Sequence, residues 1–360
     1  MTFVDDAFFS EEKNLSFVPL RTYLYFNHIK LAVCTSFFYK HENHYYLITN
    51  WHNVTGREPD TLVCKSQNCA IPNRLSIEIL YTKLSQRNVL AQTVLYGSAQ
   101  QKAELASYEY TFQLYKDSGD SPTEPIWYEH PKYGRKIDIV AIPLNSLDLI
   151  KFEENEIREI IKPVKKNKSI KRKNQYLDNL DDIVEAIKKN NSIKRKDQDL
   201  DNIVAANASN LGLNPKLKYY LTQGLDVFVL GFPIGISGGW KFPIWKRGSI
   251  ASDPSEDIDG LPLIFIDTAT REGMSGSPVY VQTHYVPEQI NSPSTIPKSA
   301  TQAYFLVPKV RDFLGIYSGR VGNDPFKAQL GTVWKQTAIE DVITGASPGI
   351  SSFDLIPLEP

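Results

Sequence analysis

The chain contains only three cysteines, Cys34, Cys64 and Cys69, among its 360 residues. A set this small and odd argues against a secreted protein that is stapled by disulfides, and it suits a reducing compartment. Four residues separate Cys64 from Cys69, rather than the two of the commonest zinc motifs. We therefore expect thiols at these positions, and a zinc site is the minor alternative.

The sequence also lacks an excess of charge of one sign, and it lacks long apolar runs. The 40 Lys and Arg residues are balanced by 41 Asp and Glu, so the formal net charge is -1. No global field then directs the protein toward nucleic acid or an anionic membrane. No apolar stretch has the length of a membrane span, and the acidic start Met1–Asp6 lacks the features of a secretory signal. We expect a cytoplasmic globular protein without a membrane partner.

Two β-rich regions flank a different, charged segment. In the first region, short runs rich in Tyr, Phe, Val and Ile alternate with polar turns, which is typical of successive strands. Its clearest pair, Val33–Tyr39 and Tyr45–Asn50, predicts a hairpin. The same texture returns after Lys216, in apolar runs that start at Leu225, Gly248, Leu263, Pro278 and Phe313.

The intervening residues 151–213 are rich in charged side chains, and their apolar residues have helical spacing. Residues 167–179 are repeated at 190–202, which indicates a tandem duplication inside an insertion. Two copies are too few for a self-supporting solenoid. We expect a solvated helical excursion. The alternative is docking of a protein or nucleic-acid partner through the basic runs Lys171–Lys173 and Lys194–Lys196.

These patterns divide the chain into four parts. We expect an N-terminal β-barrel at 1–145, the charged helical insertion at 146–215, and a C-terminal β-barrel at 216–346 that ends in a helix. The helical pattern covers Val333–Ile343 and is followed by a glycine, as a helix stop should be. The remaining residues 347–360, with several Ser and Pro, are typical of a poorly ordered tail.

A candidate nucleophile lies in the glycine-rich run Arg271–Val279. Glycines on either side of Ser275 let the backbone turn sharply, which exposes the serine oxygen and points neighbouring N–H groups into one pocket. Ser275 is then the nucleophile, and the amides of Gly273 and Ser275 are the oxyanion donors. Taken alone, such a run is more typical of a tight turn between strands.

A candidate base and its orienting acid lie in the first β-rich region. His52 follows an apolar strand run, where a histidine is held in place while one face stays open, as a general base requires. Asp138 opens the apolar run Lys136–Leu144, so it needs a hydrogen-bonding partner if it is buried. A histidine N–H is a suitable partner, and the aspartate can fix its tautomer. A structural histidine and a solvent-facing aspartate are the alternatives.

The order His, Asp, Ser and the three local strings resemble trypsin-like serine peptidases, particularly the bacterial intracellular and Deg-type branches. Thr49–His52 is similar to the Thr-Ala-Ala-His block of that family, and Asp138–Ile142 to its Asp-Ile-Ala-Leu block. Gly273–Pro278 is similar to its Gly-Asp-Ser-Gly-Gly-Pro block. The resemblance implies a His52, Asp138 and Ser275 triad in a chymotrypsin-like fold of two antiparallel β-barrels.

Two softer matches extend the resemblance. Leu230–Gly235 resembles the Gly-Tyr-Pro turn of the Deg-like branch, and Gly315–Gly319 resembles the strand that pairs with the substrate backbone. By that likeness Ser318 and Gly319 would bind a peptide as an added β-strand. Ala269, six residues before Ser275, would lie at the floor of the specificity pocket. Because alanine carries no charge, a small or medium apolar residue before the cleaved bond is favoured.

The sequence therefore predicts a mainly β serine endopeptidase that needs no cofactor and no metal and acts on a polypeptide substrate. The alternative is a catalytically latent protease-fold module that binds a peptide, protein or nucleic acid, with the basic repeated insertion as its docking element. A third hypothesis keeps the chemistry and makes the substrate a small ester.

Overall fold

The hairpin expected around residues 33–50 is present in the computed structural model of the protein, where β2 (Ile29–His41) pairs antiparallel with β3 (His44–Thr49). The structure describes residues 15–66, 68–84, 103–116, 124–144, 206–207, 221–284, 309–321 and 329–355. All of them belong to one compact unit, formed by residues 1–143 and 205–360, apart from Leu144. Most of the charged insertion, including both copies of its repeat, lies outside the described residues.

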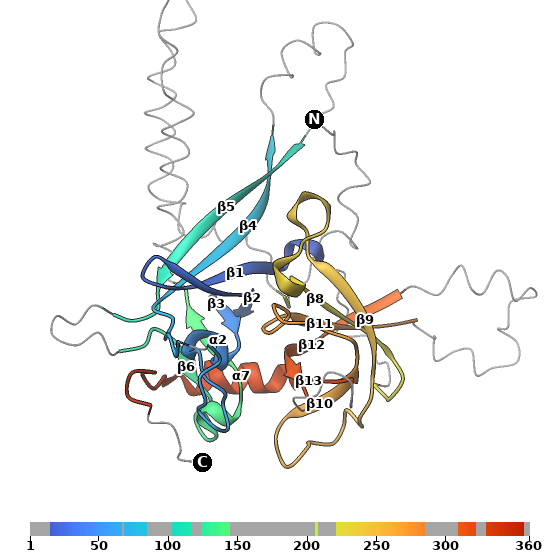
Figure 1. The fold of residues 1–360 in the computed structure, drawn as a ribbon. Helices are drawn as coiled ribbons and strands as arrows, with labels where there is room; N and C mark the ends of the chain where they lie inside the picture. Colours follow the sequence, from blue (N-terminus) through green and yellow to red (C-terminus); the bar gives the residue numbers. More distant parts are fainter. Residues whose placement is uncertain are drawn as a thin grey trace, which may run out of the picture. The chain divides into compact units, whose positions relative to one another are not determined.

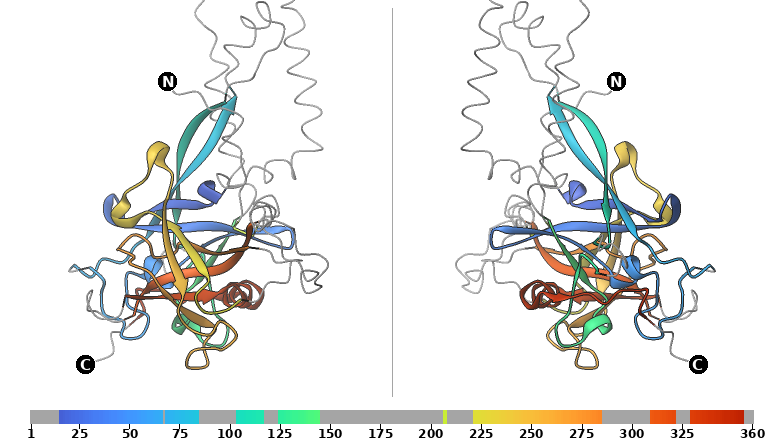
Figure 2. Two further views of the ribbon diagram at one scale, coloured as in Figure 1. Left: turned by 90° about the vertical axis from the view of Figure 1, so that its right-hand side faces the viewer. Right: turned by 90° about the vertical axis from the view of Figure 1, so that its left-hand side faces the viewer.

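The first sheet is built from eight antiparallel strands in the order β14-β6-β7-β3-β2-β1-β4-β5. Figure 1 shows β4 and β5 as a long two-stranded ribbon, and both views in Figure 2 show it, in cyan and teal, extending away from the other strands. Besides β2 and β3, the sheet contains β1 (Pro19–Phe26), β4 (Arg74–Leu84), β5 (Ala103–Gln113), β6 (Tyr128–Glu129), β7 (Val140–Pro143) and β14 (Ser347–Pro348).

Among the described residues, the regular strands of this sheet do not close into the barrel expected for the first half. A short pairing joins the residues after β5 to those before β6, because the amide of Ile126 donates to the carbonyl of Leu114 at 3.1 Å and the amide of Lys116 to that of Glu124 at 2.9 Å. With only two residues, β6 is too short to extend this pairing into a regular ladder. The first half is therefore an antiparallel sheet, and a double barrel stays a prediction.

The second half forms a closed antiparallel barrel in the order β10-β13-β12-β11-β8-β9. Alternate residues of its strands point inward, as the period of two requires, and pack into one core that includes Val227, Val229, Ile264, Ile266 and Val281. The strands are β8 (Asp226–Gly231), β9 (Ile244–Ile250), β10 (Leu263–Asp267), β11 (Pro278–His284), β12 (Lys309–Arg320) and β13 (Leu330–Lys335). This barrel confirms the prediction that the second region of the sequence forms β-strands.

The described helices are short and lie at the ends of strands. Those of the α type are α2 (Trp51–Thr55) and α7 (Gln336–Gly345). Single 3-10 turns occur at η2 (Leu15–Phe17), η4 (Gly134–Lys136), η7 (Pro233–Gly235) and η8 (Gly239–Lys241). None of the helices in these ranges is long and apolar enough to cross a membrane.

Helix α7 starts three residues later than the helical pattern predicted. Val333, Trp334 and Lys335 belong instead to β13, where they complete ladders with β10 and β12. The helix packs against β6 and β7 of the first sheet and against β12 and β13 of the barrel. It therefore bridges the two β structures.

The residues after α7 differ from the poorly ordered tail expected at 347–360. Strand β14 pairs with β6, and Ser351 and Ser352 are buried. The amide of Gly349 also donates to the carbonyl of Trp127 at 2.9 Å. Residues 347–352 are thus attached to the first sheet, because main-chain hydrogen bonds hold them there without a long apolar run.

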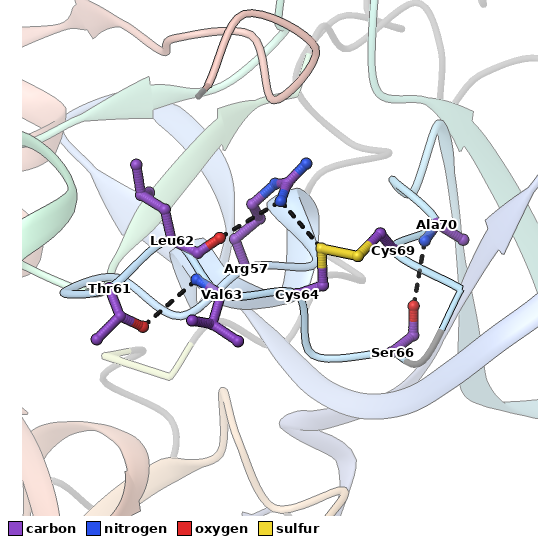
Figure 3. Close-up of a disulfide and its surroundings, with 8 residues drawn as sticks. All are labelled: Arg57, Thr61, Leu62, Val63, Cys64, Ser66, Cys69 and Ala70. Atoms are coloured by element: carbon purple, nitrogen blue, oxygen red, sulfur yellow. Dashed lines mark hydrogen bonds between the residues drawn. A yellow bond between two sulfur atoms is a disulfide. The ribbon is translucent and has the colours of Figure 1, made fainter. Parts of the chain in front are cut away.

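The expected thiols at Cys64 and Cys69 are a wrong prediction, because the two residues form a disulfide (Figure 3). Their Cα atoms lie 5.0 Å apart, which is a normal disulfide separation. The chain can turn back so tightly because Cys69 has a left-handed backbone with φ of 47°. Arg57, two residues after α2, donates to the Cys64 sulfur at 3.0 Å and joins this loop to the end of the helix. Cys34 is a buried free thiol.

Candidate active site

His52 is the second residue of α2, which begins where β3 ends. A helix of five residues has little stability of its own, so contacts with the rest of the protein must hold it. Asn50 stands at the N-cap but makes no capping bond with its side chain. Its Nδ2 instead donates to the carbonyl of Asp138 at 2.7 Å, which attaches the start of α2 to the segment before β7.

Asp138 holds His52 by two hydrogen bonds. Its Oδ1 accepts the backbone N–H of His52 at 2.9 Å, and its Oδ2 lies 2.6 Å from Nδ1 of the imidazole. Both residues are buried, with 4% and 7% of their surfaces exposed. An ionised carboxylate can only accept hydrogen bonds, so the proton of this pair belongs on Nδ1, and Nε2 keeps its lone pair. The pair thus presents a base at Nε2.

Ser318 connects this pair to Ser275. The Ser318 hydroxyl donates to Oδ2 of Asp138, and the Ser318 carbonyl accepts the Ser275 hydroxyl at 2.9 Å. The ladder between β12 and β13 shifts register between Tyr317 and Gly319, so Ser318 has no direct partner on β13. Sequence reasoning assigned Ser318 only to peptide binding and missed its bond to Asp138, because no local signal joins residues 180 positions apart.

The turn that carries Ser275 requires glycine at two positions. Gly273 and Gly276 have φ of +89° and +86°, in the region that residues with a side chain rarely adopt. A Cβ atom would lie 2.3 Å from the Phe232 carbonyl oxygen at Gly273, and 2.0 Å from that of Thr35 at Gly276. The two glycines therefore let the turn press against both β structures.

Thr35 of β2, in the first sheet, donates two hydrogen bonds to this turn. Its amide donates to the Ser275 carbonyl at 2.9 Å, and its hydroxyl donates to the Gly273 carbonyl at 2.8 Å. Asn53 of α2 adds a longer contact, from Nδ2 to the Ser275 carbonyl at 3.4 Å. Sequence reasoning assigned no role at this turn to Thr35 or Asn53. The sequence did carry a signal, because Thr35 is a polar residue inside the apolar run of β2. In the structure Thr35 is fully buried.

The backbone N–H groups of the Ser275 turn differ in whether they donate a hydrogen bond. The N–H of Met274 donates to the Arg271 carbonyl at 3.2 Å, and the N–H of Gly276 to the Tyr317 carbonyl at 2.9 Å. Within the part of the chain that the structure describes, the amides of Gly273 and Ser275 donate to no other group. Their role toward an oxyanion stays a prediction.

The Ser275 hydroxyl is hydrogen-bonded to the carbonyl of Ser318 in this structure. It donates to Ser318, and no hydrogen bond between Ser275 Oγ and His52 Nε2 occurs among the described residues. Rotation about the Cα–Cβ bond of Ser275 into another staggered position redirects the hydroxyl. Catalytic hydrogen bonds are often long or misaligned before substrate binds. All three sequence-predicted residues thus belong to one network, in which Ser275 reaches Asp138 through Ser318.

The residues expected to bind substrate border the same turn. Ala269 is exposed, and the next residue, Thr270, is buried and hydrogen-bonded through its hydroxyl to the Tyr317 hydroxyl. Burial raises the pKa of Tyr317 to about 12, against the opposing effects of Thr270 and Arg320. Gly319 is partly buried beside Ser318. The roles of Ala269, Ser318 and Gly319 toward a peptide stay predictions.

Comparison with known proteins gives only a distant structural likeness. No protein-family model matches the chain, and no curated protein does. The active form of the Rv3671c protease from M. tuberculosis is similar over 97% of this chain and 90% of its own, at 11% identity and a TM-score of 0.37.

Two further solved structures have the same degree of likeness. The serine endoprotease from Yersinia pestis matches 95% of this chain and 66% of its own, at 8% identity and a TM-score of 0.39. The thermostable serine protease AL20 from an extremophilic microorganism matches 92% of this chain and 98% of its own, also at 8% identity and a TM-score of 0.39. The chain is thus distantly similar in structure to serine proteases.

Proposed function

We propose that the protein is a serine endopeptidase in which Ser275 is the nucleophile, His52 the general base and Asp138 the residue that orients His52. The observation that carries this proposal is the buried Asp138 carboxylate. It holds His52 through both ring and backbone, and it is linked through Ser318 to the Ser275 hydroxyl. This arrangement leaves His52 Nε2 as the free base beside an open serine turn.

The chemistry follows from these positions. The Ser275 hydroxyl turns from Ser318 to His52, Nε2 takes its proton, and Oγ forms a bond to the carbonyl carbon of the substrate. The carbonyl π electrons move to the oxygen, which the amides of Gly273 and Ser275 stabilise. When the C–N bond breaks, the leaving amine takes the proton from His52. Water then repeats the sequence on the acyl-enzyme and releases the acid, which restores Ser275.

The substrate proposed for this site is an extended polypeptide. Ser318 and Gly319 lie beyond the ladder between β11 and β12, which ends at Ile316, and this suits the addition of a substrate strand by main-chain hydrogen bonds. Ala269 offers no charge to a substrate side chain, so cleavage after a small or medium apolar residue is favoured over cleavage after Lys or Arg. A small ester substrate would need no such strand.

The test is labelling by a fluorophosphonate probe, because the probe reports an activated serine without knowledge of the substrate. We expect the wild type to be labelled, Ser275→Ala to give no labelling, and His52→Ala and Asp138→Ala to be labelled far more slowly. Circular dichroism of each variant controls for folding. A subsequent peptide library would separate a peptidase from an esterase, since an esterase would cleave activated esters and no peptide.

A latent module is the second candidate function, and one observation favours it. The Ser275 hydroxyl donates to Ser318 and not to His52. Absence of labelling in a folded wild-type protein would support this candidate. In that case removal of residues 151–213 becomes the informative change, because loss of partner binding would assign the binding to the insertion.

A further inference from the structure

The carboxylate of Glu129 is buried and accepts hydrogen bonds from three donors. Only 4% of the residue is exposed, and within the described residues no lysine, arginine or histidine forms an ion pair with it. Its Oε1 atom accepts three hydrogen bonds, from the indole N–H of Trp51 at 3.0 Å, from that of Trp127 at 3.1 Å and from the amide of Ile350 at 3.0 Å. Burying a carboxylate is costly unless such donors satisfy it.

One of these donors belongs to the helix of the proposed base. Trp51 is the first residue of α2, is 1% exposed, and directly precedes His52. Consecutive residues of an α-helix project about 100° apart, so the indole and the imidazole leave the helix in different directions. Glu129 holds the helix through one side chain while Asp138 holds it through the next. A helix of five residues needs such anchors to stay in one orientation.

The other donors bring in the C-terminal segment. Gly349 lies so close to Trp127 that an added Cβ atom would be 2.2 Å from the indole nitrogen. The next residue, Ile350, gives its amide to Glu129. This segment follows α7, which packs against the barrel strands β12 and β13 as well as against β6 and β7. One carboxylate oxygen thus joins the C-terminal segment to the helix that carries His52.

We infer that Glu129 is a positioning residue that orients His52 through Trp51. The inference rests on the proposed function, because it assigns Glu129 a part in presenting the base. The three donors meet at Oε1, so a glutamine can accept the same hydrogen bonds, whereas leucine cannot. Charge as such is therefore less important than the acceptor.

The test compares Glu129→Leu with Glu129→Gln in the full-length protein. The rate constant for fluorophosphonate labelling should fall about 10- to 100-fold in Glu129→Leu, because displacements near 1 Å of a catalytic group have effects of this size. It should stay within about threefold of the wild type in Glu129→Gln. In parallel, the proton NMR signal of His52 Nδ1–H, assigned by its loss in His52→Ala, should shift or broaden in Glu129→Leu and persist in Glu129→Gln.

Two tryptophan variants give a matched control, and they serve if Glu129→Leu does not fold. Trp51→Phe and Trp127→Phe each remove one indole donor from the same oxygen, but only Trp51 belongs to α2. We expect Trp51→Phe to slow labelling and disturb the His52 signal, and Trp127→Phe to preserve both even where it lowers stability equally. Equal effects of the two tryptophan variants would overturn the inference.

The NMR signal separates this inference from the proposed function. If the wild type is not labelled, the endopeptidase proposal fails. The positioning role of Glu129 is then tested by the NMR signal of His52 alone. An unchanged His52 signal in folded Glu129→Leu or Trp51→Phe refutes the role of Glu129, whatever the labelling of the wild type.

Discussion

The hydroxyl of Ser275 donates to the carbonyl of Ser318 at 2.9 Å, so the proposed nucleophile is bound to the residue whose own hydroxyl contacts Asp138. Ser318 therefore has two separable functions, one of its main chain and one of its side chain. The carbonyl determines where the Ser275 hydroxyl rests. The hydroxyl supplies one of the donors that satisfy the buried Asp138 carboxylate.

Removing the Ser318 hydroxyl should weaken the site without unfolding it. Ser318→Ala keeps the carbonyl that accepts from Ser275 but takes one donor from Asp138, a loss of about 1–2 kcal/mol, or roughly 5- to 30-fold in rate. The rate constant of fluorophosphonate labelling measures this loss. Ser318→Thr retains a hydroxyl and should recover most of the rate. A fully active Ser318→Ala would show that this bond does not support the site.

Exchanging Asp138 for asparagine should nearly abolish reactivity while the fold remains. An asparagine amide can donate to Nδ1, which favours the wrong tautomer of His52, so labelling should fall by roughly 10³- to 10⁴-fold. The matched control is Asp226→Asn, which removes a carboxylate paired with Arg247 on the barrel surface and should leave labelling unchanged. A similar loss in both variants would count against a specific role of Asp138.

The Cys64–Cys69 disulfide should make only a small contribution to stability. The two cysteines are separated by only five positions in the sequence. For so short a loop, the entropy that the bridge removes from the unfolded chain stabilises the folded protein by about 2 kcal/mol. Urea unfolding with and without reductant measures the difference. A Cys64→Ser, Cys69→Ser double variant should not respond to reductant. If the wild type is equally indifferent, the bridge contributes nothing to the folded state.

Stability should decline in alkaline solution partly because of Tyr317. Burial raises the pKa of its hydroxyl from 10.0 to about 12, so the folded protein favours the neutral form. The contribution is complete below pH 10, where both states are protonated, and it is lost between about pH 10 and 12 as the unfolded chain ionises first. It amounts to about 2–3 kcal/mol.

Comparison of wild type with Tyr317→Phe isolates this contribution from that of other buried tyrosines. The free energy of unfolding should fall more steeply with pH in the wild type than in the variant across this window. Equal slopes from pH 9 to 12 would mean that Tyr317 ionises alike in the folded and unfolded states.

Several features of the fold were accessible from local patterns. The alternation of apolar runs and polar turns located the β2–β3 hairpin and the barrel strands, because strand propensity and turn chemistry act over a few residues. The start of α7 was missed because Val333–Lys335 satisfy a helical pattern and a strand equally well. Pairing with β10 and β12 decided between the two.

The disulfide and the C-terminal segment could not be predicted in the same way. The left-handed backbone at Cys69 lets the sulfur atoms of Cys64 and Cys69 meet. The spacing of the two cysteines in the sequence does not specify this backbone conformation. Residues 347–352 are polar and rich in turn formers, so their composition suggested a tail. Their attachment to β6 and Glu129 arises from backbone donors, which every non-proline residue has.

The sequence by itself determined the candidate residues His52, Asp138 and Ser275. Each alone had a structural alternative, but their order and the three strings around them resemble those of trypsin-like serine peptidases. Only the tertiary structure decided how they are supported. Ser318 reaches Asp138 across 180 positions, and Glu129 joins Trp51 to Ile350. Such contacts depend on strand order, register and the docking of short helices, which are set by the packing of the whole chain and not by the residues next to each side chain.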